Sequence, residues 1–192
     1  MKLKLKIIIA SVREQRRGPI VAEWFIQKAK EDSRFEIEVL DLKTIDLPLM
    51  NEPEHPRKQK YQFDYTKKWS AKITEADVFV FVTPEYNYGS PPSLKNAMDY
   101  LSVEWKRKAV GFVSYGGVSG GTRSVEHLKG PIVAHEMMPL PQAVNIPFFS
   151  EYINDDDKFE ANDKINEGAE NLLKNLSEWG IALKNLREST EK

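Results

Sequence analysis

Residues 77–92 read DVFVFVTPEYNYGSPP, an apolar run followed by a loop rich in proline and tyrosine. Residues 78–82 are apolar at every position, which is typical of a central parallel strand that is buried on both faces. In an open α/β sheet, ligands bind at the loops that leave the carboxyl ends of such strands. Prolines restrict the backbone on both sides of residues 86–89, which offer flat rings, an amide and close backbone approach. The stretch predicts a site for a planar, hydrogen-bonding heterocycle.

Strand-like and helix-like patterns alternate along the chain. Strands are expected at residues 3–10, 35–40, 78–82, 109–113 and 142–146, and helices at residues 19–30, 67–76, 91–101, 122–134 and 165–186. Ser90 is expected to cap the helix that follows it. This order predicts a doubly wound parallel sheet. Residues 47–64 form a long loop at the ligand end, expected to be a lid or a subunit contact, and residues 150–163 are expected to be a solvated loop.

Composition limits the class of protein. The 192 residues, 41% of them hydrophobic, are enough for one core and one domain covering residues 1–192. A net charge of -1, from 28 basic and 29 acidic residues, argues against nucleic-acid binding and favours small molecules or proteins as partners. The absence of cysteine excludes disulfides, thiolate metal sites and cysteine nucleophiles. The apolar run near residue 8 is too short for a signal peptide and no longer one follows, so we expect a soluble, cytoplasmic protein without a membrane partner.

The loop at residues 11–18, SVREQRRG, joins the first predicted strand to the first predicted helix. Free N–H groups and the helix dipole favour an anion at a helix N-terminus. Ser11 can donate its hydroxyl, and Arg13 with Arg16 or Arg17 can hold phosphate oxygens in bidentate fashion. The loop has neither the glycine pattern of a dinucleotide site nor a Walker lysine, so a monophosphate is the expected ligand. The alternative interpretation is a solvated basic turn.

A third loop, SYGGVSGG at residues 114–121, is rich enough in glycine to let a flat group approach the backbone closely. The alternative interpretation is a flexible turn. All three loops leave the carboxyl ends of predicted strands, so they share one edge of the sheet. A monophosphate at one end and a planar ring at the other describe the outline of FMN.

Three segments resemble the NADPH-dependent FMN reductase family of flavodoxin-like proteins, which includes quinone, chromate and azo-dye reductases. They are residues 10–13 (ASVR), 84–101 (PEYNYGSPPSLKNAMDYL) and 114–121. The resemblance implies a five-stranded parallel sheet in the order 2-1-3-4-5 with helices on both faces. It also implies that hydride passes from NADPH or NADH through FMN to a quinone, a flavin or another small electron acceptor. The chemistry would take place on the cofactor, with no catalytic side chain.

The resemblance also implies roles for particular residues. Ser11, Arg13, Arg16, Arg17 and Gly18 would hold the FMN phosphate; Pro84, Glu85, Tyr86, Asn87 and Tyr88 would lie along the ring and ribityl chain; Ser114, Tyr115, Gly116 and Gly117 would close over the ring. Backbone N–H groups of residues 85–88 are expected to face negative charge on the ring. Residues 47–53 resemble a loop that reaches a neighbouring subunit's flavin site in relatives, which implies a homodimer or a dimer of dimers. Ala10 departs from the glycine that many relatives have there.

Two other functions compete with this interpretation. Residues 117–121, GVSGG, match the G-x-S-x-G pattern of serine hydrolases, with Ser119 as nucleophile. However, the histidines after Ser119 are His127 and His135, and none follows Asp155, so the usual order of triad residues is not met. A non-catalytic flavin protein, either an electron carrier or an interaction module, is the second alternative. The arginine-rich phosphate loop and the near-neutral charge favour the reductase over a carrier.

Overall fold

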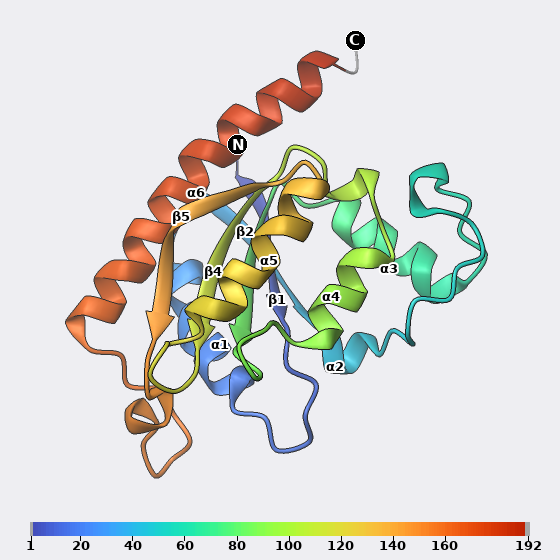
Figure 1. Cartoon of the computed structure of the whole chain (residues 1–192). Coiled ribbons are helices and arrows are strands. Elements are labelled where there is room, and N and C mark those ends of the chain that lie inside the picture. Colours follow the sequence, from blue (N-terminus) through green and yellow to red (C-terminus); the bar gives the residue numbers. More distant parts are fainter. Residues whose placement is uncertain (1, 191–192) are drawn as a thin grey trace.

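Five parallel strands form the central sheet of the computed structural model, which describes residues 2–190 (Figure 1). The strands are β1 (Leu3–Ile9), β2 (Phe35–Asp41), β3 (Val78–Pro84), β4 (Ala109–Tyr115) and β5 (Met138–Ile146). They pair in the order β2-β1-β3-β4-β5, with every neighbouring pair parallel. The predicted flavodoxin-like sheet and its strand order are therefore confirmed.

Helices cover both faces of this sheet (Figure 1). They are α1 (Gly18–Glu31), α2 (Leu42–Ile45), α3 (Asp64–Thr74), α4 (Pro92–Asp99), α5 (Thr122–Ala134) and α6 (Asp163–Thr190), with short 3-10 helices at Pro56–Lys58, Val103–Trp105 and Phe149–Tyr152. One core packs α1 and α6 against the sheet, and a second packs α3, α4 and α5 against the opposite face. Because side chains alternate along a strand, Val80 of β3 joins the first core and Phe81 joins the second.

The start of β5 and the start of α4 differ from the sequence prediction for local reasons. β5 begins at Met138, four residues before the predicted start. Pro139 and Pro141 interrupt the sequence pattern of a strand in this first half of β5. Both prolines are tolerated because β5 is an edge strand, which needs fewer N–H donors. The expected cap by Ser90 is wrong: α4 begins at Pro92 without a side-chain cap, and Ser90 Oγ lies 3.0 Å from Nδ1 of His127.

The carboxyl ends of β1, β3 and β4 lie side by side, so the three predicted ligand loops meet at one edge. Backbone hydrogen bonds hold the starts of these loops together: Ala10 N–H donates to the carbonyl of Val82 (3.0 Å), and Glu85 N–H donates to that of Tyr115 (3.2 Å). Gly116 N–H in turn donates to the carbonyl of Ile146, at the end of β5 (3.3 Å). The site is thus built on four adjacent strand ends.

None of the helices in residues 2–190 is both long enough and apolar enough to cross a membrane.

Candidate functional site

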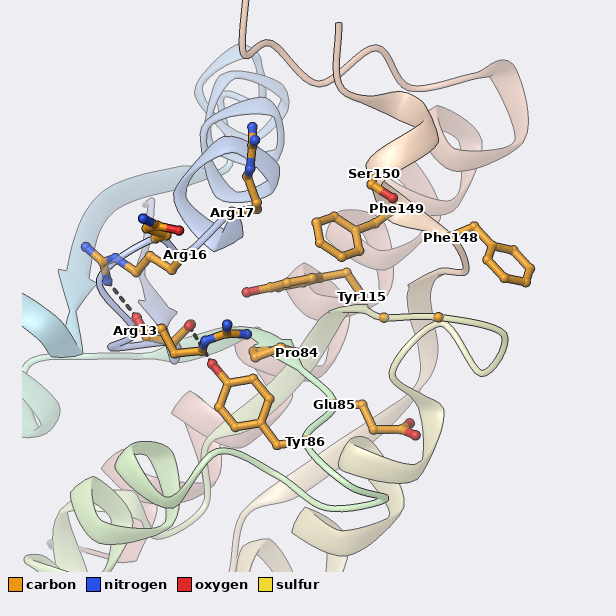
Figure 2. Close-up of a pocket in the computed structure, with 14 residues that line it drawn as sticks. Arg13, Arg16, Arg17, Pro84, Glu85, Tyr86, Tyr115, Phe148, Phe149 and Ser150 are labelled. Atoms are coloured by element: carbon orange, nitrogen blue, oxygen red, sulfur yellow. Dashed lines mark hydrogen bonds between the residues drawn. The ribbon is translucent and has the colours of Figure 1, made fainter.

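A pocket of about 340 Å³ opens at the carboxyl edge of the sheet, where the three predicted loops meet (Figure 2). Its lining comes from the β1–α1 loop, the end of β3, the end of β4 and the segment after β5: Ser11, Arg13, Gln15, Arg16, Arg17, Pro84, Glu85, Tyr86, Tyr115, Gly116, Gly117, Phe148, Phe149 and Ser150. The volume lies in the range of small-molecule and cofactor sites, which is roughly 300–1,000 Å³.

The three arginines of the β1–α1 loop have different surroundings. Arg16 donates both guanidinium arms to the carboxylate of Asp41, each at 2.5 Å, and one arm also to the carbonyl of Ser11. Arg17 is more than half exposed and pairs with Asp157. Arg13 is exposed, and within the described part of the chain it makes no hydrogen bond or ion pair. Arg13 therefore has its full set of donors for a ligand, whereas Arg16 holds the loop in shape.

The start of α1 lies beside these arginines. The helix begins at Gly18 with Pro19 in its first turn, and no side chain caps its N-terminus. Its positive end is therefore open to an anion, and the binding of a phosphate there stays a prediction. Gly18 is required here by a close approach, because a Cβ at this position would lie 2.4 Å from Oη of Tyr115.

Tyr86 and Tyr115 form the next part of the wall, with their hydroxyl ends turned toward the arginine loop (Figure 2). Oη of Tyr86 and Oγ of Ser11 are 2.7 Å apart, so the β3 loop is tied directly to the β1 loop. Tyr115 is 3% exposed, and its ring meets the ring of Phe149 edge-on at 4.9 Å between centroids. Burial raises the pKa of the Tyr115 phenol well above its usual range, so this hydroxyl stays protonated.

Glu85 joins the β3 loop to the glycine loop and to α5. Its carboxylate accepts hydrogen bonds from Oγ of Ser119 (2.7 Å), from the backbone N–H of Arg123 (3.2 Å) and from Nη1 of Arg123 (3.0 Å). Burial alone would raise the pKa of Glu85, but these hydrogen bonds outweigh it and hold the pKa below its usual range. Glu85 is therefore an ionised acceptor in a structural network, with no proton to donate.

The same network leaves Ser119 without a histidine. Its hydroxyl donates to Glu85 (2.7 Å), while His127 contacts Ser90 and His135 packs near Trp105. Within residues 2–190, no histidine is hydrogen-bonded to Ser119 as a general base would be. The serine hydrolase alternative thus has no support in the geometry.

Ten of the fourteen predicted site residues line the pocket, and Gly18, Asn87, Tyr88 and Ser114 do not. Ser114 is fully buried beneath the glycine loop, where its hydroxyl donates to the carbonyl of Gly120 (2.7 Å). Asn87 and Tyr88 occupy the centre of a tight turn with φ of +48° and +67°. Of the backbone N–H groups of residues 85–88 that were expected to face negative charge on the ring, two already have partners in the protein: that of Glu85 donates to the carbonyl of Tyr115 and that of Tyr86 to the carbonyl of Gly89.

The residues after β5, together with Gln15, are the part of the lining that sequence reasoning missed. Phe148 N–H donates to the carbonyl of Gly117 (3.1 Å) and Phe149 N–H to that of Gly116 (3.4 Å), which fastens this segment to the glycine loop. Ser150 completes the segment in the pocket wall. A signal was present, because an aromatic pair follows the fifth strand after a single proline, and the carboxyl end of that strand shares the ligand edge.

Comparison with known proteins identifies the family. The family model for NADPH-dependent FMN reductase matches residues 3–151. The chain belongs to this family. It is 38% identical over 148 residues to an NAD(P)H-dependent FMN reductase of Schizosaccharomyces pombe, covering 75% of this chain and 74% of that one.

Two further comparisons give a shorter sequence match and a match of fold. A shorter stretch of 61 residues is 51% identical to an NAD(P)H:quinone oxidoreductase of Solanum tuberosum, covering 30% of this chain and 31% of that protein. Among solved structures, the flavoenzyme NAD(P)H:(acceptor) oxidoreductase FerB of Paracoccus denitrificans superposes with a TM-score of 0.73 at 20% identity. The match covers 94% of this chain and 98% of FerB, and it shows the shared fold.

The pocket residues fit the cofactor that the family name implies. At one end, Arg13, the Ser11 hydroxyl and the uncapped start of α1 are donors suited to a phosphate. At the other end, the backbone of the glycine loop faces free space, since a Cβ at Gly117 would have no atom within 4 Å. The buried ring of Tyr115 stands between the two ends. This arrangement suits a ligand with a phosphate tail and a flat head.

Proposed function

We propose that this protein is an FMN-dependent NAD(P)H oxidoreductase that transfers hydride from NADPH or NADH to a small electron acceptor. The observation that carries the proposal is the pocket itself, in a chain of the NADPH-dependent FMN reductase family. At one end the pocket has Arg13, which has no partner among residues 2–190, and a helix N-terminus; at the other end it has open glycine backbone. FMN, when bound, supplies the centre that accepts and passes on the hydride.

The residues of the chain would bind and orient the cofactor. Ser11, Arg13 and the start of α1 would hold the phosphate, with Arg17 as a second cation that would first have to leave Asp157. The Arg16–Asp41 fork and the Glu85 network would keep the loops at fixed separation, which is the positioning that hydride transfer needs. Gly116 and Gly117 would let a planar nucleotide or acceptor approach one face of the ring.

Small molecules are the acceptors that this site suits. The names of the Schizosaccharomyces pombe and Solanum tuberosum relatives point to a flavin and a quinone, respectively. Both are planar molecules that an open glycine-lined wall can admit. A quinone or a flavin is accordingly the acceptor class that we propose.

The protein would act as a homodimer or a dimer of dimers. Leu49 is 81% exposed and Val12 is 42% exposed, and both line a second hollow of about 540 Å³ that α2 and α4 also border. Exposed apolar side chains around a hollow beside the β1 loop support a contact with a second copy of the chain. A cytoplasmic location stays a prediction from the sequence.

The test is the visible absorption spectrum of the purified protein, first alone or with added FMN, and then with NADPH in the absence of oxygen. Flavin bands that bleach on addition of NADPH, and steady NADPH oxidation when a quinone is supplied, are the expected results. Flavin binding without steady nucleotide oxidation would favour the electron carrier. A protein that binds no FMN and oxidises no nucleotide would overturn the proposal.

A further inference from the structure

Arg123 lies next to the pocket at the carboxyl edge of the sheet, although it does not line it. It lies in the first turn of α5, and its Nη1 donates to Glu85, which is a pocket-lining residue (3.0 Å). By contrast, Arg57 lies in the 3-10 helix of the long loop, and Arg107 lies before β4 at the opposite edge of the sheet. Of these three arginines outside the phosphate loop, Arg123 is the one tied to the pocket wall, through its hydrogen bond to Glu85.

Tyr88 and Arg123 form an exposed pair of a ring and a cation. The guanidinium carbon of Arg123 lies 4.0 Å from the centre of the Tyr88 ring, and this ring is 71% exposed. Tyr88 also has a φ of +67°, a left-handed conformation that is unfavourable for a non-glycine residue. Two reciprocal backbone hydrogen bonds between Tyr86 and Gly89, both 2.9 Å long, hold the turn that places Tyr88 in this conformation. The turn thus presents a large ring to solvent at a conformational cost.

The guanidinium of Arg123 still has donors for a second anion. An arginine carries five N–H donors in a planar fork, and the described contacts of this side chain use Nη1 alone. The side chain is 40% exposed, whereas that of Glu85 is 9% exposed. Glu85 therefore fixes one arm of the fork at the inner side of the mouth, and the remaining edge is left for a ligand outside it.

We propose that Tyr88 and Arg123 bind the 2′-phosphoadenosine end of NADPH. Arg123 would donate to the 2′-phosphate, because a guanidinium fork matches phosphate oxygens in charge and geometry. Tyr88 would stack on the adenine with the ring face that Arg123 does not cover. NADH carries a hydroxyl where NADPH carries the phosphate, so it would gain the stacking contact and not the ionic one. This inference rests on the proposed function, since it selects between the two nucleotides that the reductase would use.

Binding of nucleotide fragments to the FMN-loaded protein tests the site without turnover. Adenosine 2′,5′-bisphosphate and 5′-AMP would be titrated by calorimetry against wild type and Arg123→Gln. We expect the affinity for the bisphosphate to fall about five- to tenfold and that for 5′-AMP to stay the same. Raising the salt concentration should reduce the wild-type advantage of the bisphosphate, because an exposed ionic contact is screened. The ratio of kcat/KM for NADPH to that for NADH should fall by a similar factor.

Arg34→Gln is the matched control. Arg34 is 41% exposed and paired with Asp32, much as Arg123 is paired with Glu85, but it lies between α1 and β2 at the opposite edge of the sheet. Tyr88→Asn is the second variant, since asparagine tolerates the left-handed conformation and an exposed ring contributes little to folding. Arg34→Gln should change neither affinity. Tyr88→Asn should weaken the binding of both fragments to the same extent, because both contain adenine.

Several results would overturn the assignment. They are an equal loss of affinity for both fragments in Arg123→Gln, an unchanged affinity of that variant for the bisphosphate, or a change in its sedimentation mass without a change in nucleotide selectivity. The last would place Tyr88 and Arg123 in a contact between copies. A protein that binds the bisphosphate as expected but oxidises neither nucleotide would instead contradict the proposed function alone.

Discussion

Replacing Arg13 with glutamine should weaken the binding of FMN and leave the binding of riboflavin unchanged. The two ligands share the ring and the ribityl chain and differ in the terminal phosphate. Arg13 is the arginine of the β1–α1 loop with no protein partner among the described residues, whereas Arg16 is held by Asp41. Replacing Arg13 should therefore remove a contact with the phosphate and leave the contacts with the ring and the ribityl chain unchanged.

The expected size follows from the contact that would be lost. A hydrogen bond to a charged group contributes about 1.5–3 kcal/mol. Since each 1.4 kcal/mol is a factor of ten in affinity, the FMN dissociation constant should rise about ten- to 150-fold. Arg17→Gln should have a smaller effect, because Arg17 is 53% exposed and must first give up its ion pair with Asp157.

The assay is a titration of flavin-free protein with FMN and, separately, with riboflavin, followed by quenching of flavin fluorescence. Wild type, Arg13→Gln and Arg17→Gln would be compared under the same salt conditions. Equal weakening of FMN and riboflavin in Arg13→Gln would show that the loop had lost its shape. Unchanged FMN affinity in Arg13→Gln would refute the assignment of the phosphate to this residue.

Three other predictions concern the support of the site and the stability of the fold. Gly18→Ala should place a methyl group 2.4 Å from Oη of Tyr115, displace that ring, lower FMN affinity and cost about 1–3 kcal/mol of stability; an unaltered FMN titration would contradict this. Asp41→Asn should weaken the fork with Arg16 and lower the free energy of unfolding in urea by about 1–3 kcal/mol, and an unchanged midpoint would count against it. Burial, with a further contribution from a neighbouring arginine, lowers the pKa of Lys108 from 10.5 to about 7 in the folded protein. Between these two pH values the unfolded chain binds more protons than the folded protein. The free energy of unfolding should therefore rise with pH across this range. Lys108→Met should flatten that rise, and parallel pH profiles of the two proteins would show that Lys108 does not cause it.

The sequence predicted elements best where a local pattern is strong. The predicted bounds of α5 agree with the observed Thr122–Ala134, and the wholly apolar stretch at residues 78–82 forms the first five residues of β3, which is buried throughout. Prediction was less complete at β5, where prolines interrupt the strand pattern, and at α2, a single turn begun by the Asp41 carboxylate accepting from Lys43 N–H. A short helix of this kind depends on one side-chain contact, which periodicity does not reveal.

Sequence by itself determined which loops meet and what chemistry they offer, because parallel strands bring their carboxyl ends to one edge and residue types define donors and rings. Only the tertiary structure decided which donors are free. Arg16 is held by a carboxylate 25 positions away and Arg17 by one 140 positions away, while Arg13, in the same loop, has neither. Ser119, which matched a nucleophile pattern, donates instead to Glu85, 34 positions before it. Hydrogen bonds select partners by distance in space, and local sequence carries no measure of that distance.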